Sequence, residues 1–222
     1  MPSSDRGGDG LRALRSEYES AARARHYAEE RWTRTRRARR TDRREQGFVG
    51  AWLEELGPFR RALDLPCGTG RFAPLLARHA HEVVAVDAAH AMLLRHPGRS
   101  RLQASAGALP FAEASFDVVL CSRLLHHLLE PELRTAVLAE FARVCRGPLI
   151  ASHFDSRSYQ AWRAGIRRRD RARFAQTPAS FRAEALAAGW RERDRRYVAR
   201  GWSQQTWVLL EPVGERRTGG RA

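Results

Sequence analysis

The sequence contains no lysine and no asparagine, and all 40 of its basic residues are arginines, so its net charge of +15 comes from arginine alone. Such a bias reflects codon composition as much as selection for a basic surface. The charge is also uneven. Residues 47–156 hold 11 arginines and 11 acidic residues, whereas residues 1–46 hold 13 against 8 and residues 157–200 hold 13 against 4. The sequence therefore predicts a neutral central region between two basic flanks.

Long apolar runs are missing too. No stretch of about 18 apolar residues is present, so a membrane-spanning helix is not expected. The N-terminal MPSSDRGGDGLRALR has no apolar core like that of a secretory signal, and we expect cytoplasmic residence by default. The three cysteines, Cys67, Cys121 and Cys145, form no CxxC pair, which favours free thiols over a disulfide framework or a zinc site.

The apolar sequence that is present suffices for one globular domain, because 43 % of the 222 residues are hydrophobic. Strand signals occur at 62–65, 81–87, 101–105, 115–122 and 147–154. Helix signals alternate with them at 71–79, 88–96 and 131–145, and another follows at 178–190. The segments 195–200 and 205–212 are typical of a closing hairpin. This alternation predicts an α/β fold with a parallel sheet covered on both faces.

A helical arm is predicted before this domain. Six residues fall near one face at helical spacing: Leu11, Leu14, Tyr18, Ala21, Ala28 and Trp32. Residues 34–45 are too polar to bury themselves, and we expect a solvated helix or loop there. Phe48, Trp52 and Leu56 then form a stripe on a helix that ends at Gly57.

The predicted organisation follows from these segments. Residues 1–46 form a basic helical arm, of which residues 1–10 are expected to be disordered. Residues 47–213 form the main domain, which includes an Arg-rich insertion at 155–177. Residues 214–222 form a disordered tail.

The segment LDLPCGTGR (63–71) places a glycine turn between a strand and a helix. Gly68 and Gly70 give the backbone the freedom to approach a ligand closely. Pro66 has no N–H, so any backbone contact must come from Cys67 onward. Asp87 ends the next strand, where a carboxylate can accept hydrogen bonds from two ribose hydroxyls. Together these features predict a ribose-containing cofactor.

Two cofactors compete for this turn. GTGRFA (68–73) fits the G-x-G-x-x-A pattern of dinucleotide sites, which leaves an NAD(P)-dependent oxidoreductase open as an alternative. An ionised Asp64 at the strand end would, however, repel a pyrophosphate, and the chain leaves little sequence for a hydride-acceptor domain. S-adenosylmethionine has a cationic sulfonium and an α-amino group, which Asp64 would favour.

Four segments, in this order and at this spacing, resemble the class I (Rossmann-like) S-adenosylmethionine-dependent methyltransferases: LDLPCGTGRF, VVAVDAAHAML, GALPFAEASFDVVLCSRLLHHL and LAEFARVCRGPLI. Within that class, the sequence most resembles the group that includes the ubiquinone/menaquinone-biosynthesis methyltransferases. The match covers about residues 47–154. It implies a doubly wound, mostly parallel seven-stranded sheet with an antiparallel last strand. It also implies that the arm and residues 155–190 shape the acceptor pocket.

The resemblance implies a set of cofactor-binding residues. The methionine end of the cofactor would lie at Asp64, Gly68 and Gly70, the ribose at Asp87, and the adenine at Ala88 and Met92. Where the family usually has an aspartate for the adenine amino group, this chain has Ser105. Ser122 and Arg123 would lie next to the sulfonium. The full predicted set is Asp64, Pro66, Cys67, Gly68, Gly70, Asp87, Ala88, Met92, Ser105, Ala106 and Ser122.

Methyl transfer depends largely on positioning and on the exclusion of water, and a general base can assist it. His126 and His127 follow the fourth strand, and His153 ends the fifth. We consider these three histidines candidate bases, against the alternative that they cap a helix or pack in the core. No carboxylate or cysteine spacing supports a metal site around them, and no metal is predicted.

The arginines after the fifth strand admit three interpretations. As a cap over the pocket, they would bind an anionic acceptor such as a carboxylate or phosphate, together with Arg123. The residues of this cap are Arg167, Arg168, Arg169, Arg171 and Arg173, with Trp162 and Phe174. As an outward patch, the arginines and aromatic residues of 162–174 would bind RNA. As a solvated helix they would do neither.

The sequence therefore predicts a methyltransferase that acts on a small-molecule acceptor at an O, N or C nucleophile. An RNA methyltransferase using the basic flanks, an NAD(P)-dependent oxidoreductase and a non-catalytic scaffold remain alternatives. The oligomeric state stays open.

Overall fold

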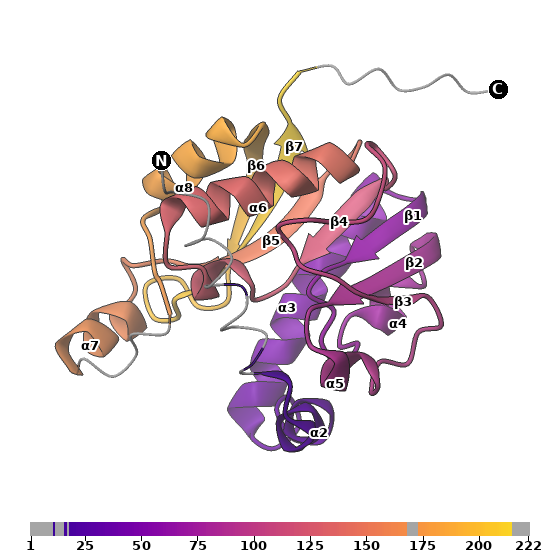
Figure 1. Ribbon diagram of the computed structural model, residues 1–222. Coiled ribbons are helices and arrows are strands. Elements are labelled where there is room, and N and C mark those ends of the chain that lie inside the picture. The colour runs from indigo at the N-terminus through magenta and orange to yellow at the C-terminus, as the bar shows by residue number, and fades with distance from the viewer. Residues whose placement is uncertain (1–10, 12–15, 17, 168–172, 215–222) are drawn as a thin grey trace, which may run out of the picture.

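The computed structural model describes residues 11, 16, 18–167 and 173–214, which are built around one seven-stranded sheet (Figure 1). The strands lie in the order β3-β2-β1-β4-β5-β7-β6. Their bounds are β1 Phe59–Asp64, β2 Ala80–Asp87, β3 Arg101–Gln103, β4 Val118–Cys121, β5 Leu149–Phe154, β6 Trp190–Tyr197 and β7 Gln205–Pro212. Strands β1 to β5 are parallel, and β7 pairs antiparallel with β5 and β6. The predicted fold class, including its antiparallel last strand, is confirmed.

Helices cover both faces of the sheet because its central strands are apolar on both sides. In β4, Val119 and Cys121 belong to the core on one face, with side chains of α6 (Pro131–Val144) and α8 (Pro178–Ala187). Val118 and Leu120 belong to the core on the other face, with α3 (Arg36–Leu56) and α4 (Ala73–Leu76). In Figure 1, α6 lies in front of the sheet and α3 emerges from behind it. Side chains that alternate between two buried faces are what a parallel sheet requires.

The arm contains α2 (Ala21–Glu29), and the arginine-rich run that follows is the first half of α3. Thr35 caps α3, since its hydroxyl oxygen accepts a hydrogen bond from the N–H of Ala38 over 3.0 Å. The helix then continues across the predicted boundary between arm and domain to Leu56. The predicted disordered start at 1–10, and residues 215–222 of the predicted tail, lie outside the described residues.

The helices after the first two strands are shorter than predicted. α4 and α5 (His90–Leu93) have only four residues each, where the sequence predicted helices at 71–79 and 88–96. The first begins at Ala73, after a turn in which Gly70 adopts a φ of 82°. The second is followed within a few residues by Pro97 and Gly98, which favour a turn.

The end of the sheet also differs from the prediction. The helix predicted at 178–190 ends at Ala187, and Gly189, with a φ of 86°, turns the chain into β6. β6 therefore begins at Trp190, not at residue 195. It is an edge strand rich in arginine and acidic residues, which protect an exposed sheet edge but hide the strand signal in the sequence.

Within the described ranges, no helix combines the length and the apolar character needed to cross a membrane. The predicted Arg-rich insertion contains α7 (Tyr159–Arg167), which stands at the left edge of Figure 1, clear of the sheet.

Candidate active site

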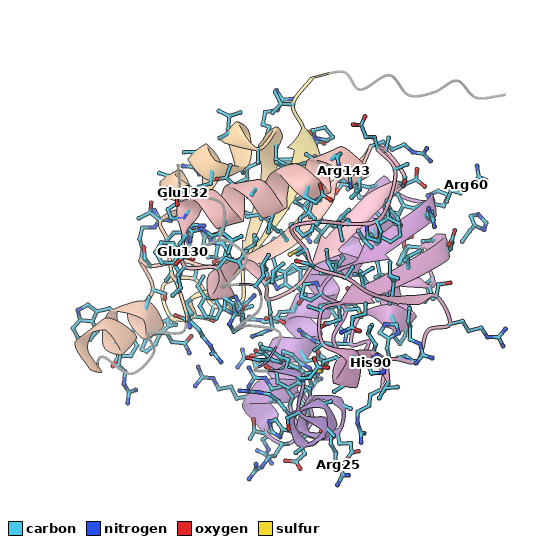
Figure 2. All side chains as sticks on the ribbon, viewed as in Figure 1. Arg25, Arg60, His90, Glu130, Glu132 and Arg143 are labelled. Atoms are coloured by element: carbon cyan, nitrogen blue, oxygen red, sulfur yellow. The ribbon has the colours of Figure 1, made fainter. Side chains whose placement is uncertain are left out.

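A cavity lies at the carboxyl edge of the parallel strands. Its walls come from the loops after β1, β2, β3 and β4 and from the arm, as expected for a doubly wound sheet, whose ligands bind outside the carboxyl ends of the strands. Figure 2 draws the side chains of the described residues on the ribbon. Twelve of the residues predicted from the sequence line the cavity: Pro66, Cys67, Gly68, Asp87, Ala88, Met92, Ser105, Ala106, Ser122, Arg123, His126 and His127.

Asp87 ties the glycine turn to the end of β2. One carboxylate oxygen accepts a hydrogen bond from the N–H of Gly68 at 2.9 Å, and the other accepts from the N–H of Ala89 at 2.9 Å. Burial raises the pKa of Asp87, and these backbone hydrogen bonds oppose the rise. Each oxygen keeps a further lone pair, so the carboxylate can still accept hydrogen bonds from a ligand in the cavity that it lines.

The two glycines of the turn have different surroundings. A Cβ on Gly68, whose φ is 55°, would meet no atom within 4 Å, and Gly68 lines the cavity. A Cβ on Gly70 would lie 2.4 Å from Cδ of Pro97. Gly70 does not line the cavity, and its glycine is required by close packing against the loop at 96–98, so a direct cofactor contact at Gly70 is not supported.

The sequence predicted backbone contacts to the ligand from Cys67 onward, but the structure places the first available N–H later in the turn. The N–H of Cys67 donates to the carbonyl oxygen of Val86 at 2.9 Å, and the N–H of Gly68 donates to Asp87. Both amides are thus used within the protein, and direct amide contacts to a ligand would begin at Thr69, which also lines the cavity.

Asp64 lies beneath the turn and does not line the cavity. It is buried at the end of β1, and one of its carboxylate oxygens has no hydrogen-bond partner among the described residues. Burial, with the nearby Asp87 as a smaller cause, raises the pKa of Asp64 to about 8. The sequence-based assumption of an ionised Asp64 is therefore wrong for the protein without a ligand. A cationic group placed beside it would restore the ionised form and would satisfy the unpartnered oxygen.

The two histidines after β4 line the cavity as neutral side chains. His126 is stacked on Phe154 with ring centroids 3.8 Å apart, and burial, followed by the neighbouring His127 and arginines, lowers its pKa well below the ordinary value. Burial and the positive charges of Arg173 and Arg123 lower the pKa of His127 to about 4. Its Nε2 lies 3.4 Å from the Tyr18 hydroxyl. Both rings can accept a proton at neutral pH, although weakly.

His153 is not brought to the cavity. It is buried in β5, stacked on Phe181 with ring centroids 4.1 Å apart. Its Nε2 lies 2.8 Å from Nη1 of Arg195, so this nitrogen accepts the hydrogen bond and the ring is neutral. Burial and Arg195 lower its pKa to about 3. These contacts are those of a packed core histidine, and we do not assign it a catalytic role.

Sequence reasoning missed a buried cluster that joins the arm to the cavity wall. Glu45 of α3 has no exposed surface and forms ion pairs with Arg71 at 2.6 Å and with Arg123 at 2.7 Å. The two guanidinium groups lie 3.6 Å and 4.7 Å from the ring centroid of Trp32, which lines the cavity. The partners are far apart in the chain, and no short-range sequence pattern could have indicated them.

Other arm residues also line the cavity. Tyr18, Tyr27, Arg31 and Trp32 contribute to its wall. α2 is held there by a small core in which Ala24 packs with Ala89 and Met92. The apolar face read from the sequence included Tyr18 and Trp32, so the signal for a covering arm was present.

Of the predicted acceptor-binding residues of the insertion, Trp162 does not line the cavity. Trp162 is 60 % exposed and packs against Tyr159. Arg167 ends α7, and Arg168 lies outside the described residues. Arg173, by contrast, lines the cavity, and the N–H of the adjacent Phe174 donates to the carbonyl oxygen of His126 at 2.7 Å.

This sheet and its cavity define a Rossmann-like, cofactor-dependent enzyme, and comparisons with known proteins agree. A "Methyltransferase domain" family model matches residues 63–147. A demethylmenaquinone methyltransferase of Mycobacterium sp. strain KMS is 33 % identical over 173 residues, which cover 70 % of this chain and 73 % of that protein. The chain belongs to the class I S-adenosylmethionine-dependent methyltransferases.

Further relatives share parts of the chain or its fold. A demethylmenaquinone methyltransferase of Renibacterium salmoninarum is 35 % identical over 112 residues, and the match spans 48 % of this chain and 46 % of that relative's length. The crystal structure of magnesium protoporphyrin IX methyltransferase from Synechocystis with bound S-adenosylhomocysteine has a TM-score of 0.72 at 15 % identity, covering 90 % of this chain and 99 % of that one. A 1,6-didemethyltoxoflavin-N1-methyltransferase from Burkholderia thailandensis has a TM-score of 0.68 at 19 % identity, with 96 % and 93 % covered. The two solved structures show the shared fold.

Proposed function

We propose that this methyltransferase acts on a small, aromatic acceptor that carries an ionisable oxygen. The observation that carries the proposal is the composition of the cavity, which is lined by Asp87 and Gly68 and also by the aromatic side chains of Tyr18, Tyr27 and Trp32. Aromatic walls favour a planar, largely apolar molecule.

The charge of the acceptor is proposed from Arg31. Its guanidinium lies 5.7 Å from the ring centroid of Tyr27 and 5.3 Å from that of Trp32, and its Nε is buried without a hydrogen-bond partner among the described residues. A buried arginine N–H without a partner favours a ligand oxygen, and most strongly an ionised one. Demethylmenaquinone, which appears in the names of the relatives, is the first acceptor to test.

The cofactor-binding residues fit S-adenosylmethionine. Asp87 would hold the ribose hydroxyls, and the buried carboxyl of Asp64 would face the cationic end. When bound, S-adenosylmethionine supplies an electrophilic methyl group, and its sulfur keeps the bonding electron pair as S-adenosylhomocysteine is formed. The arm would exclude water from the cavity through Tyr18, Tyr27 and Trp32.

We further propose that His127 takes the acceptor's proton. The ring lines the cavity, is neutral because its pKa is about 4, and is oriented by the Tyr18 hydroxyl 3.4 Å from Nε2. The proton would pass to the ring as the acceptor atom bonds to the methyl carbon, and then to water. With so low a pKa, positioning and exclusion of water would contribute more to the rate than the base.

The test is transfer of a radiolabelled methyl group from S-adenosylmethionine to demethylmenaquinone and to other hydroxylated aromatic compounds. Arg31→Gln should raise KM for an acidic acceptor without changing S-adenosylhomocysteine affinity. Arg60→Gln is the matched control, because Arg60 is exposed and does not line the cavity. Methylation of RNA together with no transfer to any small aromatic acceptor would contradict the proposal.

A further inference from the structure

A second groove lies between the first half of α3, the start of α7 and the turn before β7. Its lining residues are Arg37, Arg40, Thr41, Arg44, Tyr159, Gln160, Arg163, Val198, Ala199, Trp202 and Ser203. The turn and α7 are joined by backbone hydrogen bonds, from Tyr159 to Gly201 at 2.8 Å and from Gln160 to Trp202 at 3.1 Å. From these contacts and charges we propose that the groove docks on an anionic lipid surface.

The first observation is a cluster of exposed aromatic rings. Trp202 is 68 % exposed, Trp162 is 60 % exposed and Tyr159 is 43 % exposed. The Tyr159 ring lies 5.2 Å from that of Trp202 and 5.6 Å from that of Trp162, centroid to centroid. Exposed tryptophan and tyrosine rings in one patch have the amphipathic character that suits the interface between lipid head groups and acyl chains.

The second observation is the charge beside these rings. The first half of α3 carries exposed arginines on its outer side: Arg36, Arg37, Arg40, Arg43 and Arg44. The two acidic residues of the same stretch, Asp42 and Glu45, are turned inward, where both pair with Arg71. No acidic residue lines the groove in the part of the chain that the structure describes. An uncompensated row of arginines next to exposed tryptophans is complementary to anionic head groups.

The ring geometry favours a lipid surface over RNA. The three rings pack against one another at interplanar angles of 33° and 59°, so they form one contiguous apolar patch and are not separate platforms for successive bases. α3 runs antiparallel to the strands, since it ends where β1 begins, and α7 follows the carboxyl end of β5. The groove therefore lies at the same edge of the sheet as the cavity, and docking there would bring the cavity towards the lipid.

The test is flotation of the full chain with vesicles of phosphatidylcholine mixed with phosphatidylglycerol, and with phosphatidylcholine alone. The wild type should bind the anionic vesicles more tightly, and salt should weaken binding. Arg37→Glu/Arg40→Glu should lower partitioning about tenfold or more, and Trp162→Ala/Trp202→Ala should also lower it. Binding of S-adenosylhomocysteine and the melting temperature should stay unchanged in both double variants, because these side chains are exposed and lie outside the cavity.

The matched controls change charge or apolar surface elsewhere. Arg60→Glu/Arg99→Glu makes the same change in net charge, and Leu94→Ala removes another exposed apolar side chain; both should bind as the wild type does. Equal loss in the Arg60/Arg99 variant would show that net charge, not the groove, drives binding, and would overturn the proposal. Equal binding to neutral and anionic vesicles would overturn it too. So would loss of affinity for a labelled single-stranded RNA in the groove variants with vesicle binding unchanged.

Discussion

The carboxylate of Asp87 accepts a hydrogen bond from the backbone N–H of Gly68 over 2.9 Å. This contact fixes the glycine turn after β1 against the end of β2, and it turns a carboxylate and an open glycine backbone towards the same cavity. The cofactor site is thus set by a side-chain-to-backbone contact between neighbouring strands.

Asp87→Asn should weaken binding of S-adenosylhomocysteine by about 1.5–3 kcal/mol, because an amide cannot replace the charge-assisted hydrogen bonds of the carboxylate. Calorimetric titration measures this. Glu82→Gln, on the same strand but exposed, is the matched control and should bind normally. Unchanged affinity in Asp87→Asn would refute the assignment of this residue to the cofactor.

The two glycines of the turn should respond differently to the same substitution. Gly68→Ala costs the strain of a positive φ, about 1–2 kcal/mol, and should mainly reduce cofactor affinity. Gly70→Ala adds a clash with Pro97 to its strain at φ 82°, and should destabilise the fold more. Urea denaturation beside S-adenosylhomocysteine titration separates the two effects. If Gly68→Ala proved the less stable variant, the packing account of Gly70 would be wrong.

Asp64 should make the stability of the ligand-free protein depend on pH. Its carboxyl has a pKa of about 8 when folded and an ordinary value near 3.8 when unfolded. Between these values the folded state binds more protons, so the contribution of Asp64 to the free energy of unfolding falls by up to about 1.4 kcal/mol per pH unit as the pH rises. Above pH 8 the loss is complete.

Asp64→Asn removes the carboxyl group that binds a proton when the protein folds. The variant should become more stable relative to the wild type as the pH is raised from 5 to 8, while losing affinity for S-adenosylmethionine. His126, His127 and His153 have lowered pKa values, which make the free energy of unfolding rise with pH. Both proteins contain these histidines, so their effect cancels in the difference between the two curves. Parallel curves of unfolding free energy against pH would contradict the account of Asp64.

Glu45→Gln should destabilise the protein by about 3–5 kcal/mol, because it leaves Arg123 without its buried counter-charge and leaves Arg71 with Asp42 alone. Trp32→Ala removes the ring beside these arginines but keeps the ion pairs, so it should cost less stability and instead open the cavity. Urea denaturation tests the first effect, and quenching of bound-ligand or tryptophan fluorescence by acrylamide tests the second. Equal stability of Glu45→Gln and the wild type would show that this cluster does not stabilise the fold.

Much of the fold follows from local signals. The apolar strands β1, β2, β4 and β5 stand between turns rich in glycine and proline, and their alternation with helices specifies the parallel sheet. The predicted start of β6 was five residues too late because β6 is an edge strand and lacks an apolar pattern. Its arginines and acidic residues keep the edge solvated, and the same residue types occur in exposed helices and loops.

The residues of the candidate site also differ in whether local sequence signals could predict them. Asp87 and Gly68 could be predicted because strand end, turn and ribose chemistry lie within a short stretch of chain. Glu45 with Arg71 and Arg123 could not, since the pairing depends on how α3 packs behind the sheet. The sequence could not decide between the two alternatives for His153, because catalytic and core histidines both occur at strand ends. Arg195 and Phe181, which favour the core alternative, come from later elements.

The central claim is that S-adenosylmethionine binds in the cavity at the carboxyl edge, with Asp87 at its ribose. A crystal structure with S-adenosylhomocysteine tests this most directly. The account predicts both ribose hydroxyls within hydrogen-bond distance of the Asp87 carboxylate and the amino group of the methionine end next to Asp64. Density for the ligand at any other place, with Asp87 making its two backbone hydrogen bonds alone, would contradict it.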